Sequence, residues 1–325
     1  MPANSWGSRF VVTSFGESHG EAMGVVIDGC PAGVPFDREL LLHNLQRRRP
    51  GQHGDPQRVV SVRSEEDMPQ ILSGIFADKT LGTPIALLVY NKDQRSQDYD
   101  QIAHQPRPGH ADDVWREKFT HVDHRGGGRA SGRETLSRVM AGSVAQMYLR
   151  AVTPETRVTA KALQIGPVHL QGSEVMTPEV IDLLQKARAE GRSYGGRVLL
   201  TITQPPASLG QPVFHKLKAD LASAIMGIGA VNGIEIGAGV VAADAEGSEF
   251  HSRPEQDQYG GIRGGISTGE EIQITVSFKP TATVLDQAKA GRHDPCIIPR
   301  ALPVLEAMVN LVLADHYLWR LTDKI

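Results

Sequence analysis

The sequence predicts a single α+β domain that covers residues 1–325. Two observations lead to this prediction. Short strand-like runs alternate with a few strongly periodic helices, and no linker, low-complexity tract or repeat of fixed period divides the chain. Hydrophobic residues make up 40% of the chain and charged residues 22%, which is typical of a globular protein. A chain of this length can bury a large core.

The first half of the chain carries strand patterns and two helix patterns. Strands are expected at 9–13, 23–28 and 84–90, with a polar turn between the first two. Asp37 can cap a helix that runs to about Arg49 and stops at Pro50-Gly51. A second helix follows a capping box formed by Ser131 and Glu134, with apolar residues at helical spacing over 136–147.

The second half is expected to contain three more helices and three strands. Thr177-Pro178 opens one helix that Gly191 ends. The spacing of apolar residues predicts another helix, which carries Val213, Phe214, Leu217, Leu221 and Ile225. The last helix is predicted at 303–321, and the strands at 197–203, 234–243 and 271–278.

Charge and cysteine content exclude several classes of protein. The net charge of −3 provides no overall basic field, so we expect no nucleic-acid partner. Cys30 and Cys296 form no Cys-x-x-Cys pair, which fits a reducing cytoplasm. The N-terminus lacks the apolar core of a signal peptide, and no apolar run approaches the roughly 20 residues of a membrane span. We therefore expect a cytoplasmic protein without a membrane partner.

The polar stretch 91–133 is unusual for a compact domain unless it forms a site. It contains a basic cluster of arginines and histidines: Arg107, His110, His121, His124, Arg125, Arg129 and Arg133. Within it, Gly126-Gly127-Gly128 leads into the helix at Ser131, and such a loop can present backbone N–H groups to an anion. The sequence leaves two interpretations open, an anion site and a flexible turn. The triplet at 47–49 is more simply explained by compensation of a helix dipole.

Several other residues are candidates for proton transfer or metal binding. His19, His110 and His293 lie in polar turns, and imidazole titrates near neutral pH. Asp294 could be a base held ionised by a neighbouring guanidinium, or part of a helix-entry turn. His121 and His124 have a metal-like spacing but no evident third ligand, so we predict no metal site.

Nucleotide and hydrolase motifs give weaker alternatives. The chain has no P-loop, and Gly227-x-Gly229 lacks a third glycine and follows a helix. Gly16-Glu17-Ser18-His19-Gly20 matches the G-x-S-x-G pattern of serine hydrolases, but it lies near the N-terminus, before the strands that normally precede it. A serine hydrolase that uses Ser18 therefore remains a second hypothesis.

Three separated segments resemble the chorismate synthase family. They are Gly16-Glu17-Ser18-His19-Gly20 with the run to Pro31, Arg125-Gly126-Gly127-Gly128-Arg129-Ala130-Ser131-Gly132-Arg133-Glu134-Thr135, and Arg292-His293-Asp294-Pro295-Cys296 with Glu306. Shorter matches begin at Arg47, Asp93, Arg107 and Lys279. Together they cover nearly the whole chain in the family's order, so the set is highly specific.

The resemblance implies a β-α-β sandwich and a homotetramer. It also implies an anti-1,4 elimination of phosphate from 5-enolpyruvylshikimate 3-phosphate (EPSP), with reduced FMN (FMNH2) as cofactor and no net redox change. NADPH would act only as a reductant of the flavin. No nicotinamide motif is visible, so an external flavin reductase is the favoured source of reduced flavin.

The resemblance also implies roles for individual residues. His19 would protonate the leaving phosphate, His110 would serve the protonation state of reduced FMN, and Asp294 would help the N5 region of the flavin to accept the C6 proton. Ser18 and Ser131 could relay protons. The substrate would be bound by Arg48, Arg107 and Arg133. The cofactor would be bound by Arg129, Ala130, Ser131, Gly229, Ala230, Gly264, Lys279, Pro280, Thr281, Ala282, Thr283 and Arg292.

The chain departs from the family pattern at a few places. A basic residue that often follows the arginine triplet is not obvious near Gly54 or Arg58, and 257–259 differs from the usual lead into Gly260. The stretch from Thr283 to Gly291 is shorter than in many members. A third hypothesis is therefore a non-catalytic protein of the same descent that binds anions or flavin.

Overall fold

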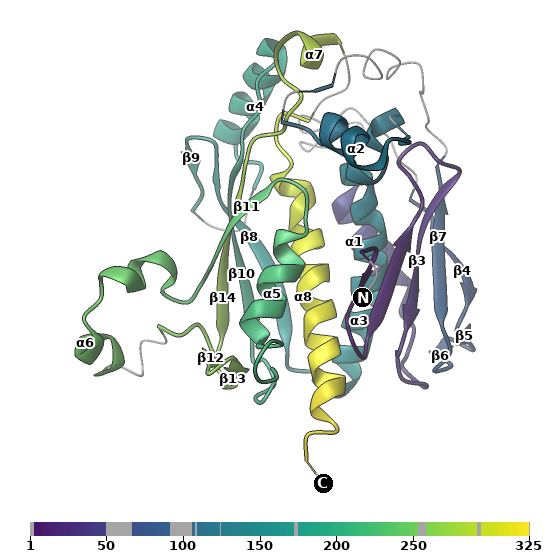
Figure 1. Cartoon of the computed structure of the whole chain (residues 1–325), viewed down its shortest axis with the longest axis vertical. Helices are drawn as coiled ribbons and strands as arrows, with labels where there is room; N and C mark the ends of the chain where they lie inside the picture. The colour runs from purple at the N-terminus through teal and green to yellow at the C-terminus, as the bar shows by residue number, and fades with distance from the viewer. Residues whose placement is uncertain are drawn as a thin grey trace.

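Two five-stranded antiparallel sheets enclose a layer of helices (Figure 1). The computed structural model describes residues 3–49, 67–91, 106–107, 109–123, 125–171, 175–252, 258–290 and 294–324. The arrangement confirms the predicted α+β class and the β-α-β sandwich.

The first sheet is built mainly from the N-terminal part of the chain. Its strand order is β1 (Ser5–Trp6), β2 (Val11–Phe15), β3 (Ala22–Asp28), β7 (Ile85–Tyr90) and β4 (Gln70–Ser73). Alternate residues of β3 and β7 point inward, so Met23, Val25 and Ile27 are buried beside Ile85 and Leu87. A small hairpin of β5 (Ile75–Phe76) and β6 (Lys79–Thr80) follows β4.

The second sheet comes from the C-terminal half. Its order is β11 (Val231–Ile236), β14 (Ile272–Phe278), β10 (Gly196–Thr203), β8 (Arg157–Ile165) and β9 (Val168–His169). Val198, Leu200 and Ile202 are fully buried on its inner face, while Lys161 and Gln273 lie on the solvent side. This alternation is typical of an antiparallel sheet with one solvated face.

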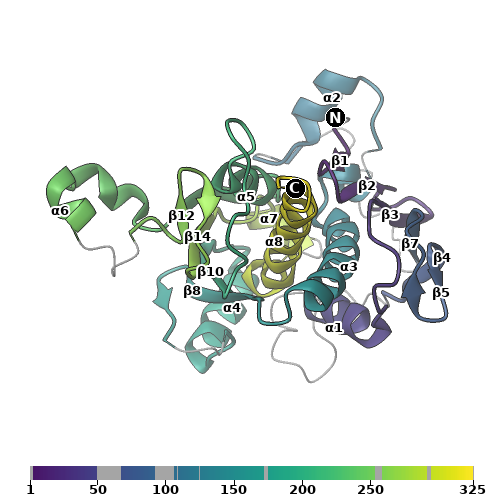
Figure 2. The same cartoon turned by 90° about the horizontal axis from the view of Figure 1, so that it is seen from below.

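Helices α3 (Thr135–Val152) and α8 (Ile298–Arg320) run side by side between the sheets (Figures 1 and 2). They approach closely at Gly142, where an added Cβ atom would lie 2.4 Å from the Cα atom of Ala307. Helix α8 is long and apolar enough to span a membrane by hydropathy, but 83% of that window is buried inside the protein. This burial is typical of a core helix.

The remaining elements flank this frame. Helix α1 (Arg38–Arg48) packs on α3 and α8, and α5 (Leu217–Met226) packs on α8. Figure 2 shows α6 projecting away from the body of the molecule. The other elements are α2 (Asp112–Phe119), η3 (Arg125–Ala130), η4 (Gly132–Glu134), α4 (Pro178–Glu190), η5 (Gly239–Asp244), α6 (Gly247–Ser252), β12 (Ile262–Arg263), β13 (Ile266–Ser267) and α7 (Leu285–Ala290).

The two ends of the chain are joined at the buried carboxylate of Asp315. Its Oδ1 atom accepts hydrogen bonds from the backbone N–H groups of Ser8, Arg9 and Phe10, at 2.8, 2.5 and 2.8 Å. Helix α8 thereby fixes the backbone that enters β2, more than 300 residues away in sequence.

Several sequence predictions need correction. Helix α8 begins at Ile298, five residues before the predicted start, because Pro299 is tolerated in the first turn. Val213 and Phe214 are exposed and precede α5. The strand predicted at 234–243 ends at Ile236, and η5 follows it.

The predicted capping box does not form as expected. The hydroxyl of Ser131 accepts from the N–H of Arg133 and caps η4 rather than α3. The carboxylate of Glu134 instead pairs with Arg138, one turn further along.

Candidate active site

A cavity of about 750 Å³ opens between the two sheets. Its walls come from the N-terminal segment and β2, the start of α2, the glycine loop with the first turns of α3, the turn after α5, and α8. Most of the predicted site residues line it: Arg48, Arg107, His110, Arg129, Ala130, Ser131, Arg133, Gly229, Ala230, Lys279, Thr281, Ala282, Thr283 and Asp294. The structure thus brings together segments that lie far apart in the sequence.

Two of these arginines are almost completely buried. The side chains of Arg48 and Arg133 are 1% and 7% exposed, and both form ion pairs with Asp67. Arg48 lies in the last turn of α1, as compensation of the helix dipole predicts, but that interpretation did not anticipate its buried ion pair. Arg47 lies in the same turn and makes two hydrogen bonds to Glu306 on α8.

Arg107 and His110 are held together by Asp112. Two guanidinium nitrogens of Arg107 donate to this carboxylate at 2.8 and 2.9 Å, and Nδ1 of His110 lies 2.7 Å from it. Burial raises the pKa of Asp112, but the hydrogen bonds from Arg107 and His110 and the charge of Arg107 outweigh burial. The pKa therefore lies well below its ordinary value, and Asp112 stays ionised at neutral pH.

The glycine loop places Ser18 and His19 behind the cavity wall. Gly126, Gly127 and Gly128 have φ values of 61°, 80° and 52°, a run that side chains rarely tolerate. An added Cβ atom on Gly126 would lie 2.0 Å from Nδ1 of His19 and 2.8 Å from Oγ of Ser18. Gly126 lines the cavity, whereas Ser18 and His19 are buried directly behind it.

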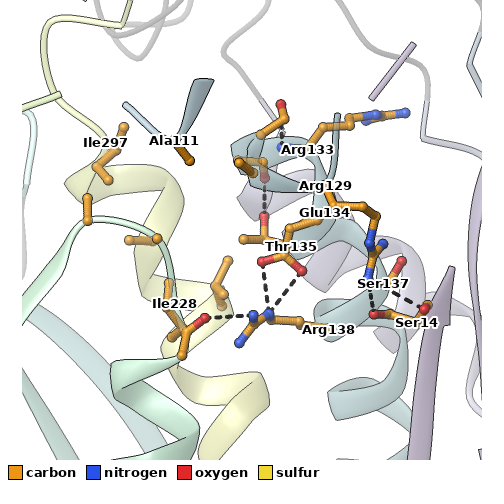
Figure 3. A pocket seen from close by; sticks show the side chains of 18 of the residues that line it. Ser14, Ala111, Arg129, Arg133, Glu134, Thr135, Ser137, Arg138, Ile228 and Ile297 are labelled. Carbon is orange, nitrogen blue, oxygen red and sulfur yellow. Dashed lines mark hydrogen bonds and ion pairs between the residues drawn. The ribbon is translucent and has the colours of Figure 1, made fainter. Parts of the chain in front are cut away.

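Arg129 and Arg138 are tied to the walls of the cavity (Figure 3). Arg129 donates to Oγ of Ser14 at 2.6 Å and to the carbonyl of Gly16 at 3.0 Å. Arg138 pairs with Glu134 at 3.0 Å and donates to the carbonyl of Gly227 at 2.7 Å. Arg138 thereby connects α3 to the turn that precedes Gly229.

Asp294 is paired with Arg300, a residue that sequence analysis did not identify. A guanidinium nitrogen of Arg300 donates to Oδ2 of Asp294 at 2.5 Å, and Nε donates to the backbone carbonyl of Arg48 at 3.3 Å. Thr281 donates its hydroxyl proton to the carbonyl of Asp294 at 2.9 Å. The two predicted neighbours, Arg292 and His293, lie outside the described residues, as does His124.

The predicted cofactor residues divide into two groups. Those that line the cavity are Arg129, Ala130, Ser131, Gly229, Ala230, Lys279, Thr281, Ala282 and Thr283. Pro280 and Gly264 do not line it. Gly264 lies in the turn between β12 and β13, where the next carbonyl, of Gly265, accepts from Leu217 at the start of α5. Gly264 is therefore at the opposite end of α5 from Gly229.

The geometry around Ser18 excludes the hydrolase elbow. That motif needs a sharp turn from a strand into a helix, but residues 16–20 connect the antiparallel strands β2 and β3. Among the described residues, no group of three His, Cys, Asp or Glu side chains could hold a metal ion.

The sandwich and its cavity are suited to a small ligand that carries carboxylates or phosphates, because several guanidiniums line one space. The chorismate synthase family model matches residues 10–318. Chorismate synthase of Bdellovibrio bacteriovorus is 60% identical over the full length of both chains. Chorismate synthase of Methanococcoides burtonii is 44% identical over 97% of this chain and 96% of its own.

The fold agrees with these similarities. A solved crystal structure of chorismate synthase matches with a TM-score of 0.74 and 26% identity, over 98% of this chain and 94% of that chain. The chain belongs to the chorismate synthase family, whose enzymes act in the shikimate pathway.

Proposed function

We propose that the chain catalyses the anti-1,4 elimination of phosphate from EPSP to give chorismate, with reduced FMN as cofactor. The observation that carries this proposal is the convergence of Arg48, Arg107, Arg133, His110 and Asp294 on one cavity. These residues come from four segments of the chain, and all four belong to the matched family region.

The charges of the cavity suit the substrate. EPSP carries two carboxylates and a phosphate, and guanidinium groups bind both through paired N–H donors. Arg48, Arg107 and Arg133 provide three such groups on the cavity wall. They bind and orient EPSP for elimination, and their burial reduces competition from water.

The cavity also fits a flavin. Its volume lies in the range of roughly 300–1,000 Å³ that is usual for ligand sites. Ile228, Val304, Met308 and Leu311 provide an apolar wall for an aromatic ring system, and Lys279 provides a cation for a phosphate. When bound, reduced FMN supplies transient electron density that assists phosphate departure. NADPH is at most a reductant.

The proton carriers have distinct positions. His19 donates a proton to the leaving phosphate, with Ser18 beside it as a relay. His110, held by Asp112, would set the protonation state of reduced FMN. Asp294, held by Arg300, helps to take up the proton lost from C6, and Ser131 can relay protons on the same wall. His19 does not itself line the cavity and lies next to Gly126, which does.

The family resemblance supports a homotetramer in the cytoplasm, with an external flavin reductase as the source of reduced flavin. The outer side of the first sheet and its hairpin exposes large apolar side chains, among them Phe15, Leu72, Phe76 and Tyr90. The outer face of the second sheet is polar by comparison. An exposed apolar face of this kind is typical of a subunit contact.

The proposed activity is tested by anaerobic turnover of EPSP with chemically reduced FMN. Chorismate absorbance and released phosphate are followed together. We expect both products in equal amounts, and none with oxidised FMN. Binding of FMN and EPSP without products would instead support the non-catalytic hypothesis.

Replacing Gly126 by alanine should impair catalysis through His19. The new Cβ atom cannot fit 2.0 Å from the imidazole, so His19 must shift. We expect kcat to fall by roughly 10²-fold, the cost typical of a misplacement of about 1 Å, while FMN affinity changes little. Gly33→Ala is the control, because Gly33 has a similar φ of +83° but open space around it. Normal kcat in Gly126→Ala would show that the position of His19 is unimportant.

A further inference from the structure

A buried carboxylate lies between two of the arginines proposed to bind substrate. Oδ2 of Asp67 is 3.0 Å from a terminal nitrogen of Arg48, and Oδ1 is 2.6 Å from a terminal nitrogen of Arg133. The side chain of Asp67 is only 2% exposed. One carboxylate therefore uses each of its two oxygens to hold a different guanidinium.

Asp67 is behind the arginines and outside the ligand space. Arg48 and Arg133 both line the cavity, whereas Asp67 does not. The carboxylate thus contacts the arginines without taking the place that a substrate anion would occupy. A competing carboxylate would have to line the cavity, so this position argues against autoinhibition.

Neutral acceptors also contact the pair. Arg48 donates to the hydroxyl of Thr135 at 3.3 Å, and Arg133 donates to the side-chain carbonyl of Asn91 at 3.3 and 3.2 Å. These groups can orient a guanidinium but cannot offset its charge. Two buried like charges repel strongly at short range, and the carboxylate of Asp67 between the two guanidiniums reduces this repulsion.

We propose that Asp67 is a positioning residue for EPSP: it fixes the spacing of Arg48 and Arg133 and offsets their repulsion before the substrate binds. This inference rests on the proposed function. Sequence analysis gave no indication of it, because Asp67 lies 19 residues from Arg48 and 66 from Arg133.

Asp67→Asn tests the proposal with little change in shape. The amide oxygen can accept from one guanidinium, but the amide nitrogen is a donor and cannot accept from the other. One arginine should therefore lose its bond to residue 67. We expect the Kd of EPSP, titrated calorimetrically into the protein with oxidised FMN, to rise at least about tenfold. The KM for EPSP should rise similarly, with kcat and the Kd of FMN nearly unchanged.

Asp315→Asn is the matched control for a purely structural effect. Asp315 is also a buried carboxylate, but its partners are backbone N–H groups and it lies outside the cavity. Both variants should unfold at a lower temperature, and only Asp67→Asn should weaken EPSP binding. Equal EPSP affinity in Asp67→Asn and wild type would overturn the proposal, as would tighter binding, which would indicate a competing carboxylate.

A second variant keeps the proposal testable if Asp67→Asn does not fold. Asp67→Glu keeps the negative charge but moves the carboxylate by one methylene, so it should fold and bind EPSP less tightly than wild type. Unchanged EPSP affinity in a folded Asp67→Glu would contradict the positioning role. Failure of the wild-type protein to bind EPSP would instead refute the proposed function itself.

Discussion

Replacing His110 by alanine is expected to lower kcat for EPSP by about 10²–10⁴-fold, the usual contribution of a positioned acid or base. The imidazole lines the cavity and is fixed by Asp112 and Arg107. Its loss therefore removes a proton carrier, while the other residues that line the cavity are kept. Rapid-mixing kinetics under anaerobic conditions measure kcat, and flavin fluorescence measures the Kd of FMN, which we expect to change little.

His169→Ala is a suitable control, because His169 is exposed on β9, outside the cavity. It should leave kcat unchanged. If His110→Ala retained wild-type kcat, the proposed proton role would be wrong. If FMN affinity and kcat fell by the same factor, His110 would act in cofactor binding rather than in proton transfer.

The second large effect concerns stability at the crossing of α3 and α8. Gly142→Val places a branched side chain where even a Cβ atom would lie 2.4 Å from the Cα atom of Ala307 and 2.7 Å from its carbonyl oxygen. Backbone atoms of a core helix cannot move aside without disturbing both sheets. We expect the free energy of unfolding to fall by about 3 kcal/mol, at the upper end for overpacked cores.

Chemical denaturation followed by circular dichroism measures this loss. Gly247→Val is the control, because Gly247 begins the projecting helix α6 and an added Cβ atom there meets nothing within 4 Å. It should change stability much less. Equal stability of Gly142→Val and wild type would mean that the two helices can separate locally at little cost.

Much of the fold could be predicted from local patterns. Asp37 and Thr177 cap the N-termini of α1 and α4, and Gly191 caps the C-terminus of α4, as expected. Such caps are predictable because capping depends on residues close in sequence. Strand β8 was missed, because it alternates threonine, lysine and alanine without a strong apolar run. The start of α8 was placed too late, because its two prolines suggest a break that tertiary packing overrides.

The site was predictable only in part. Sequence motifs and family resemblance identified residues whose own chemistry is visible, such as His110 and Asp294. They did not identify Asp67 or Arg300, because these residues meet their partners, Arg48 and Asp294, only in the tertiary fold. They also assigned Gly264 to the same site as Gly229, whereas the structure places the two at opposite ends of α5.

The position of α8 has a consequence for synthesis of the protein on the ribosome. The last long element of the chain fills the space between the two sheets, and its Asp315 fixes the backbone before β2. The second sheet, whose strands β8 and β10 pack on α8, cannot cover its inner face until α8 has been translated. Nascent chains must therefore carry the exposed apolar strands of the second sheet until α8 emerges, which favours binding by chaperones. A premature stop even shortly before residue 298 would leave the second sheet without the helix that covers it, and α3 without its main packing partner.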